Sequence, residues 1–292
     1  MTPLALPLEA PPADTESGAL PGLLGVDFTS APSARKPITV ARGRLSGHGP
    51  AQVLRLERID TCERFSEWEA LLDQPGPWLG AFDFPFGLPR AFVGELQLGD
   101  TADEVIRAVL QRCPDRMAFR ALVDAWGQGR PAGQRLVHRR TDLSLPGLRS
   151  TSPLQTRYVP VGFMYYEGFS RLVRAGVTAP GLRRGDDARV AVEGYPALLA
   201  HELIGARSYK NADQPDRLIA RKDIVEALEQ GRSRLGLRLK FSHGQRDQLV
   251  ADVSGDRLDA VLCLAQAAWA ASRPGHGLSA DADPVEGWIV SA

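Results

Sequence analysis

The first part of the chain carries the hydrophobic pattern of β-strands. Apolar residues run almost without interruption over residues 23–28, further strand segments follow at 37–45 and 51–59, and in the latter apolar residues alternate with polar ones. A period of two is typical of a strand with one buried face. Turn-forming residues separate the runs, including those at 47–50. The pattern therefore predicts three antiparallel strands joined in a meander.

A helix and a fourth strand are predicted next. Ser66 is placed to cap a helix that runs to Leu72, and the sequence Pro-Gly-Pro at 75–77 ends it. Residues 78–84 then resume as a buried strand. A strand that returns through a helix lies parallel to the strand before the crossover. We therefore expect an α/β fold, with a mixed sheet flanked by helices.

Helical periodicity dominates the remainder of the chain, with one further short strand at 189–194 and an Arg- and Gly-rich loop at 127–153. The predicted helices cover residues 102–113, 117–126, 161–175, 196–204, 219–230 and 257–271. We expect one domain over residues 22–292, with a helical, basic insertion at about 95–188. The Pro-rich residues 1–21 are expected to form a flexible tail.

Charge is balanced over the whole chain but not along it. The 292 residues include 35 basic and 35 acidic ones, so net charge gives no indication of a polyanionic partner. Residues 101–190, however, hold 15 Arg, no Lys and 8 acidic residues. This local excess of positive charge suits contact with phosphate groups, although a GC-rich genome explains abundant Arg equally well.

The chain is expected to be cytoplasmic. Its N-terminus lacks the basic region of a secretory signal. No apolar run reaches the roughly eighteen residues that a membrane helix requires, so we expect no membrane association. Cys62, Cys113 and Cys263 are odd in number and far apart, which is typical of reduced thiols.

Acidic residues interrupt the apolar pattern where it would otherwise continue. Asp27 ends the first run, Asp83 the fourth strand and Glu193 the strand at 189–194, while Asp256 and Asp259 flank the apolar stripe of the last long helix. A carboxylate beside buried surface is costly unless a basic group or a divalent cation compensates it. The pattern predicts a metal site, provided that the fold brings the strand ends and the late helix together.

Such a group of carboxylates has the chemistry of a two-metal phosphoryl-transfer site. Mg²⁺ and Mn²⁺ prefer oxygen ligands, and two ions about 4 Å apart activate a water and stabilise the leaving oxygen of a phosphodiester. The histidines show no zinc-ligand spacing, and the chain has no Ser elbow or Gly-rich phosphate loop. We predict Asp27, Asp83 and Asp259 as metal ligands, with Asp256 or Glu193 completing the catalytic group.

Each acid also has a structural explanation. Asp27 and Asp83 lie where a strand gives way to a turn, and a carboxylate there can accept from turn amides. Glu193 and Asp256 are placed to cap the helices that follow them. Asp259 lies inside its helix and has the weakest structural explanation.

Two basic residues are candidates for substrate binding. Lys210 follows Tyr209 and precedes a basic run that includes Arg221. These cations can contact a phosphate, although a solvated basic face is the more common role of such a run. The aromatic cluster over residues 163–169 has helical spacing and suits base stacking, but core packing explains it better.

The chain resembles a bacterial and archaeal family catalogued as domain of unknown function 429, predicted nucleases of ribonuclease H-like fold. The resemblance covers about residues 22–292 and is carried, in order, by GVDFTSAP, FDFPFGLP, VEGYPALL, SYK, DRLDAVLCLAQAAW and EGWI. It implies a ribonuclease H-like α/β core and a divalent-metal nuclease activity. The last helix is also similar to that of Holliday-junction resolvases.

The resemblance also implies roles for the acidic residues. Asp27 corresponds to the first-strand acid, Asp83 or Glu193 to the middle acid, and Asp256 with Asp259 to the final-helix acids. The chain departs from the pattern in the helix after the third strand, which usually supplies an acid. Its acidic residues at 67 and 69 are not clearly on the side that faces the sheet.

The leading hypothesis is a nuclease that depends on Mg²⁺ or Mn²⁺ and acts on DNA or RNA, with the basic insertion holding the phosphate backbone. The alternative is a non-catalytic nucleic-acid-binding or regulatory protein that retains the acidic site, which the neutral net charge favours. A phosphotransferase or ATPase of the actin-like type requires two fold copies and Gly-rich phosphate loops. The chain shows one copy and no such loop.

Overall fold

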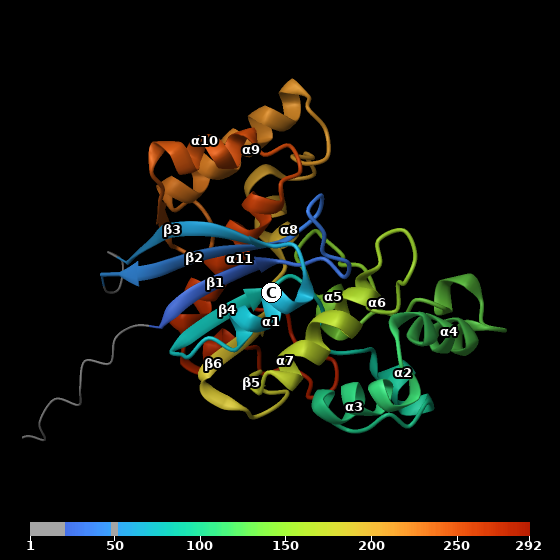
Figure 1. Cartoon of the computed structure of the whole chain (residues 1–292). Coiled ribbons are helices and arrows are strands. Elements are labelled where there is room, and N and C mark those ends of the chain that lie inside the picture. Colours follow the sequence, from blue (N-terminus) through green and yellow to red (C-terminus); the bar gives the residue numbers. More distant parts are fainter. Residues whose placement is uncertain (1–20, 48–51) are drawn as a thin grey trace, which may run out of the picture.

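A computed structural model describes residues 21–47 and 52–292. Nearly all of the tail expected at 1–21 and most of the turn expected at 47–50 lie outside the described residues. The expected α/β class is confirmed: a seven-stranded mixed sheet is flanked by helices, in the strand order β5-β6-β4-β1-β2-β3-β7 (Figure 1). In the part of the chain described, no helix has the length and apolar character needed to cross a membrane.

The predicted meander and the predicted parallel return strand are both confirmed. Strands β1, β2 and β3 pair antiparallel, and β4 pairs parallel with β1. Strand β6 continues the sheet parallel to β4, and β5 and β7 close its two edges. The strands are β1 (Gly22–Asp27), β2 (Ile38–Ser46), β3 (Val53–Cys62), β4 (Trp78–Phe82), β5 (Val177–Thr178), β6 (Asp186–Glu193) and β7 (Arg238–Lys240).

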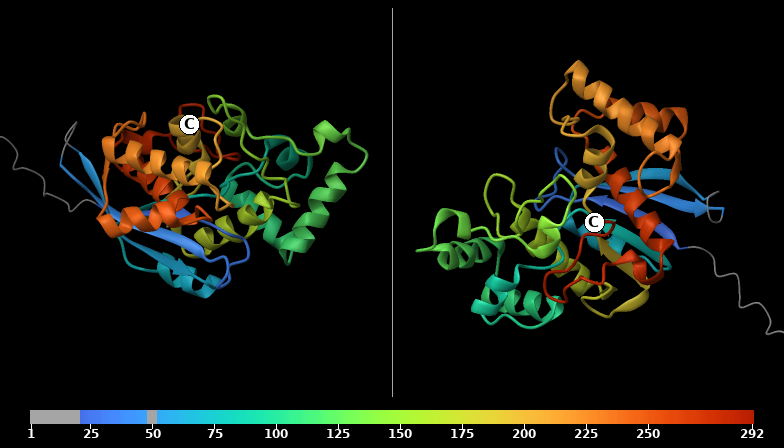
Figure 2. Two further views of the ribbon diagram at one scale, coloured as in Figure 1. Left: turned by 90° about the horizontal axis from the view of Figure 1, so that it is seen from above. Right: turned by 180° about the vertical axis from the view of Figure 1, so that it is seen from behind.

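Helices cover both faces of the sheet. One layer contains α1 (Phe65–Leu72), α2 (Arg90–Glu95), α3 (Ala102–Arg112), α4 (Arg116–Gly127), α5 (Arg140–Leu143), α6 (Val161–Met164) and α7 (Ser170–Arg174). The other contains α8 (Pro196–Ile204), α9 (Pro215–Gln230), α10 (His243–Ala251) and α11 (Asp256–Ala271). Seen from behind, α11 runs across the strands (Figure 2).

Side-chain alternation in β1 and β4 divides the core between these two layers. Leu24 and Val26 of β1 belong to the cluster with helices α1–α4 and α7, and Leu23 belongs to the cluster with α11. In β4, Phe82 lies on the α1 side and Ala81 on the α11 side. Since successive residues of a strand point to opposite faces, odd-numbered positions at the end of both strands face α11.

Helix α11 touches β1 without any side chain between their backbones. A Cβ atom at Gly25 would lie 2.1 Å from the Ala260 carbonyl oxygen and 2.1 Å from the Leu264 nitrogen. Real Cβ atoms do not approach other atoms so closely, so only glycine allows this contact. The helix is therefore held against the strand two residues before Asp27.

Several element boundaries differ from the sequence-based expectation. The first helix begins at Phe65 with Arg64 as N-cap, not with Ser66 as the cap. Gly255, at φ +82°, and not Asp256, is the N-cap of α11. The helix expected at 161–175 is interrupted by a π turn over Tyr165–Phe169. Helices α2, α5 and α10 and strands β5 and β7 were not predicted, because they are short or carry few apolar residues.

Candidate metal site

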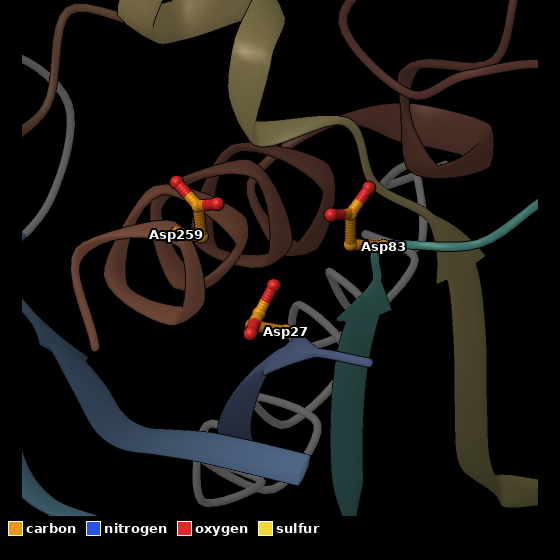
Figure 3. A group of neighbouring side chains, drawn as sticks. All are labelled: Asp27, Asp83 and Asp259. Atoms are coloured by element: carbon orange, nitrogen blue, oxygen red, sulfur yellow. The ribbon is translucent and has the colours of Figure 1, made fainter. Parts of the chain in front are cut away.

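Three of the predicted acids meet at one edge of the sheet. Asp27 ends β1, Asp83 follows β4 directly, and Asp259 lies in the first turn of α11. One carboxylate oxygen from each lies within 4.8 Å of the others, and the side chains point toward one another (Figure 3). Asp259 is buried, whereas Asp27 and Asp83 are partly accessible. The fold therefore joins residues 232 positions apart in sequence into one group, from 27 to 259.

Strand register explains why Asp27 and Asp83 lie side by side. Val26 is paired with Phe82 in the parallel β1–β4 ladder, and the Asp83 N–H donates to the Val26 carbonyl at 2.9 Å. The next residue of each strand is the aspartate, so the two acids are level at the carboxyl ends of neighbouring parallel strands. Both are at odd-numbered positions, whose side chains point to the face of the sheet that α11 covers. Asp259 lies on that helix.

Burial and mutual repulsion make ionisation of this group unfavourable. Burial, then the charges of Asp259 and Asp83, raise the pKa of Asp27 well above its ordinary value. Burial, then the charge of Asp259, raises the pKa of Asp83 to about 7. Both shifts express the same physical fact: carboxylates crowded away from water favour protonation unless a cation is near.

Lys210 and Tyr209 are the neutralising partners of Asp259. The Lys210 ammonium forms an ion pair with one oxygen of Asp259, and the Tyr209 hydroxyl donates to the other. The neighbouring carboxylates, Asp259 first, raise the pKa of Lys210 despite its burial. The ammonium is therefore charged at neutral pH. When all three aspartates are ionised, one positive charge leaves about two negative charges uncompensated.

Two arginines hold the loop that carries these partners. Arg221 of α9 is only 1% exposed and donates to the carbonyls of Tyr209, at 2.8 Å, and Val250, at 2.7 Å. Arg217, one turn earlier, donates to the Lys210 carbonyl. The guanidinium of Arg221 thus lies inside the protein, bound to backbone carbonyls. Its position makes it a positioning residue for Tyr209 and Lys210.

Glu193 does not join the three aspartates. It is paired with Phe82 in the β4–β6 ladder, not with Asp83, so its side chain points to the opposite face of the sheet. There the Arg139 guanidinium donates to both Glu193 oxygens, at 2.8 and 2.6 Å, and also binds Asp142 at 2.9 Å. The Phe86 N–H donates to Glu193 as well, at 2.9 Å. These contacts satisfy the carboxylate within the core.

Asp256 lies at the edge of the acidic group. It is the first residue of α11, one turn before Asp259, and its charge contributes to the raised pKa of Asp27. Its own pKa is raised by burial and by Asp252, and lowered by Lys36. Asp256 is not among the atoms that converge within 4.8 Å, so it can reach the group only through an intervening molecule or a side-chain movement.

The acids of α1 do not supply the missing ligand. Glu67 binds Arg64 and the Glu63 N–H, and Glu69 forms an ion pair with Arg171 at 2.9 Å. Helix α1 also packs on the face of the sheet that is opposite to α11. Helix α1 therefore contributes no acidic residue to the group formed by the three aspartates.

Sequence reasoning did not identify two features on which the site depends. The first is the hydroxyl of Tyr209, which orients Asp259; the signal available was its place beside Lys210. The second is Gly25, whose missing side chain brings α11 onto β1. A glycine within an apolar strand indicates close approach of another backbone, and that signal was present in LLGVD.

The donor set suits a hard divalent cation. Three carboxylate oxygens converge, no sulfur or imidazole donor belongs to the group among the described residues, and the net charge is negative. No family model, curated protein or solved structure matches this chain. The chemistry of the site must therefore be inferred from its own residues.

Proposed function

We propose that this protein is a divalent-metal-dependent nuclease with a ribonuclease H-like core. The observation that carries the proposal is the convergence of Asp27, Asp83 and Asp259 within 4.8 Å from two parallel strand ends and a late helix. The strand order and the antiparallel second strand are compatible with that core. The resemblance to the family of domain of unknown function 429 supports the same assignment.

The chain's own residues divide the work of such a site. Asp27, Asp83 and Asp259 would hold Mg²⁺ or Mn²⁺, which when bound supplies Lewis-acid activation of water and of the phosphodiester. Tyr209 fixes the orientation of Asp259. Lys210 places an ammonium at the site, and its remaining protons can contact a phosphate oxygen. Arg221 keeps the loop that carries both residues in place.

Cleavage of nucleic acid in the presence of Mn²⁺ tests the proposal. Single-stranded, duplex, hybrid and branched DNA and RNA are incubated with the purified chain and Mg²⁺ or Mn²⁺. We expect at least one substrate to be cut, and we expect Asp27→Asn and Asp259→Asn to abolish cutting. Asp247→Asn is the matched control, because Asp247 is exposed and its side chain has no hydrogen bond or ion pair within 21–47 and 52–292.

One observation favours a second function, that of a non-catalytic nucleic-acid-binding protein. Both oxygens of Asp259 already have protein partners, Lys210 and Tyr209, so the chain can tolerate this carboxylate without a metal. Calorimetric titration with Mn²⁺ distinguishes the two functions. Heat of binding that disappears in Asp27→Asn supports the nuclease. Salt-dependent nucleic-acid binding without such heat supports the alternative.

A further inference from the structure

A cavity of about 240 Å³ opens beside Asp83, between the sheet and the helical segment at 95–188. Its walls come mainly from the residues that follow β4, from the loop before α6 and α6 itself, and from the end of β6 with the start of α8. The apolar part of these walls consists of Phe84, Pro85, Val159, Val161, Met164, Pro196, Ala197 and Ile289. The cavity is therefore continuous with the acidic group but has a different chemical character.

Two residues that line this cavity have free hydroxyl groups. Tyr195, which is half-buried, and Thr151, which is exposed, have hydroxyls without a hydrogen-bond partner in the described parts of the chain. Lys210 also lines it, and so connects the cavity to Asp259. Asp83, Arg139, Ser150 and Glu193 line it as well, and the last three are already hydrogen-bonded to protein groups. The polar groups that remain free lie among apolar ones, as in sites that fix the orientation of a ligand.

An exposed aromatic residue directly precedes one of the cavity walls in sequence. Tyr158 is 99% exposed and adopts a positive φ of +58°, and the next residue, Val159, is a cavity wall. The loop is held in this conformation on both sides: Arg157 pairs with Asp124 at 2.6 Å, and the Val161 N–H donates to the Val159 carbonyl at 2.8 Å. A strained, fully exposed tyrosine stabilises nothing in the core, and such strain is typical of binding sites.

We propose that this cavity receives one unpaired nucleobase of the strand whose phosphodiester lies at Asp27, Asp83 and Asp259. The inference rests on the proposed function. Pockets that bind drug-sized ligands have volumes of about 300–1,000 Å³, so a cavity of about 240 Å³ suits a single ring system. The Tyr195 and Thr151 hydroxyls can bond to the base edge, and Tyr158 can stack on the next base.

The proposal defines the substrate class. A base can enter the cavity only when it is unpaired, so the substrate is a single strand, an unpaired end, or a duplex from which one nucleotide is extruded. An intact, continuous duplex would require extrusion of a base, which costs a few kcal/mol. DNA and RNA share the required chemistry, and separate arms of the experiment distinguish them.

An abasic scan tests the proposal on the full chain. Fluorescently labelled single-stranded DNA and RNA of 15 nucleotides are bound in Ca²⁺, each with one abasic position moved along the strand. Anisotropy gives the Kd for every position, and cleavage is measured separately in Mn²⁺. We expect loss of the base at one position to raise the Kd about tenfold, within the range for a stacked base. Loss of the neighbouring base, which would stack on Tyr158, should raise the Kd by less.

Two variants connect the effect to the cavity. Ala197→Phe adds a ring to a cavity wall at the start of α8, and should remove the sensitivity to that abasic position. Ala251→Phe is the matched control, because Ala251 is exposed at the end of α10, and should retain it. Tyr195→Phe keeps the ring and removes only the hydroxyl, so it should reduce discrimination among the four bases.

The outcomes separate this inference from the proposed function. A single sensitive position that Ala197→Phe abolishes supports the inference, whether or not cleavage is found. If the chain cleaves nucleic acid in Mn²⁺ but the Kd is the same for every abasic position in both DNA and RNA, the inference is overturned and the nuclease proposal stays in place. A sensitive position that persists in Ala197→Phe also overturns it, because the base is then bound elsewhere. Absence of both binding and cleavage overturns both proposals.

Discussion

Asp83→Asn should stabilise the metal-free protein at pH 8 and remove its response to metal. The substitution keeps the shape of the side chain and removes one of three crowded negative charges. In the folded wild type, burial and Asp259 raise the pKa of Asp83 to about 7, from an ordinary value of 3.8. The native state therefore binds this proton more tightly than the unfolded state does.

The sign of the pH dependence follows from linkage. Between pH 4 and pH 7 the unfolded chain has lost the Asp83 proton while the folded chain retains it, so the free energy of unfolding falls as pH rises. The interval from 3.8 to about 7 gives an upper limit of about 4 kcal/mol for the loss of unfolding free energy when Asp83 ionises. Because the side chain is partly accessible to water, we expect a loss of about 2 kcal/mol, which lowers Tm by roughly 4–8 °C.

Thermal unfolding at pH 4.5, 6 and 8 measures this effect, in EDTA and in Mn²⁺. In EDTA, the Asp83→Asn variant should have about the same Tm as the wild type near pH 4.5. Its Tm should exceed that of the wild type as pH rises. Mn²⁺ at 100 times its Kd should stabilise the wild type by about 2.7 kcal/mol and should leave the variant almost unchanged. When metal is added, the difference in stability between the two proteins therefore disappears or changes sign.

Two results would refute this reasoning. If Asp83→Asn lowered Tm in EDTA at pH 8, the carboxylate would be a stabilising partner and not an uncompensated charge. If the difference between the proteins were the same at pH 4.5 and pH 8, proton linkage would not be its cause. Asp247→Asn, on the exposed side of α10, should show neither the pH-dependent gain nor the loss of metal response.

Three further substitutions test other parts of the structure. Gly25→Ala should destabilise the protein by about 3 kcal/mol in urea unfolding, because its Cβ would lie 2.1 Å from the α11 backbone. Glu193→Ala removes one of the two carboxylates that pair with the buried Arg139 and should lower the free energy of unfolding by about 3–5 kcal/mol. Calorimetry should still detect Mn²⁺ binding. Lys210→Met removes the cation that competes for Asp259 and should tighten Mn²⁺ binding about tenfold by calorimetry, while lowering any cleavage rate.

Local pattern was sufficient to predict strands β1–β4 and β6 and the acids at their ends. Asp27 and Asp83 each stop an apolar run, and the parallel return strand places such strand ends at one edge of the sheet. Asp259 was identified because nothing in its helix explains a buried acid. These predictions depend only on hydrophobic periodicity and on the cost of burying charge.

The role of Glu193 depends on information that the sequence does not contain. Its strand pairs with β4 in a register that sets Glu193 beside Phe82, and a shift of one residue would have turned it toward the aspartates. Its partner Arg139 is 54 residues away and lies in a stretch expected to be a loop. Long-range register and ion pairing are set by tertiary packing, which local pattern does not determine.

The ion pairs of Arg139 make completion of the fold depend on three distant segments. Its guanidinium binds Asp142, Glu193 of β6 and the Glu286 carbonyl near the C-terminus, at distances of 2.6–3.0 Å. A buried guanidinium without these partners is strongly unfavourable. This part of the interior is therefore completed only after the segment around Glu286 has been synthesised, so nascent chains that stop short of it should keep the region open to water.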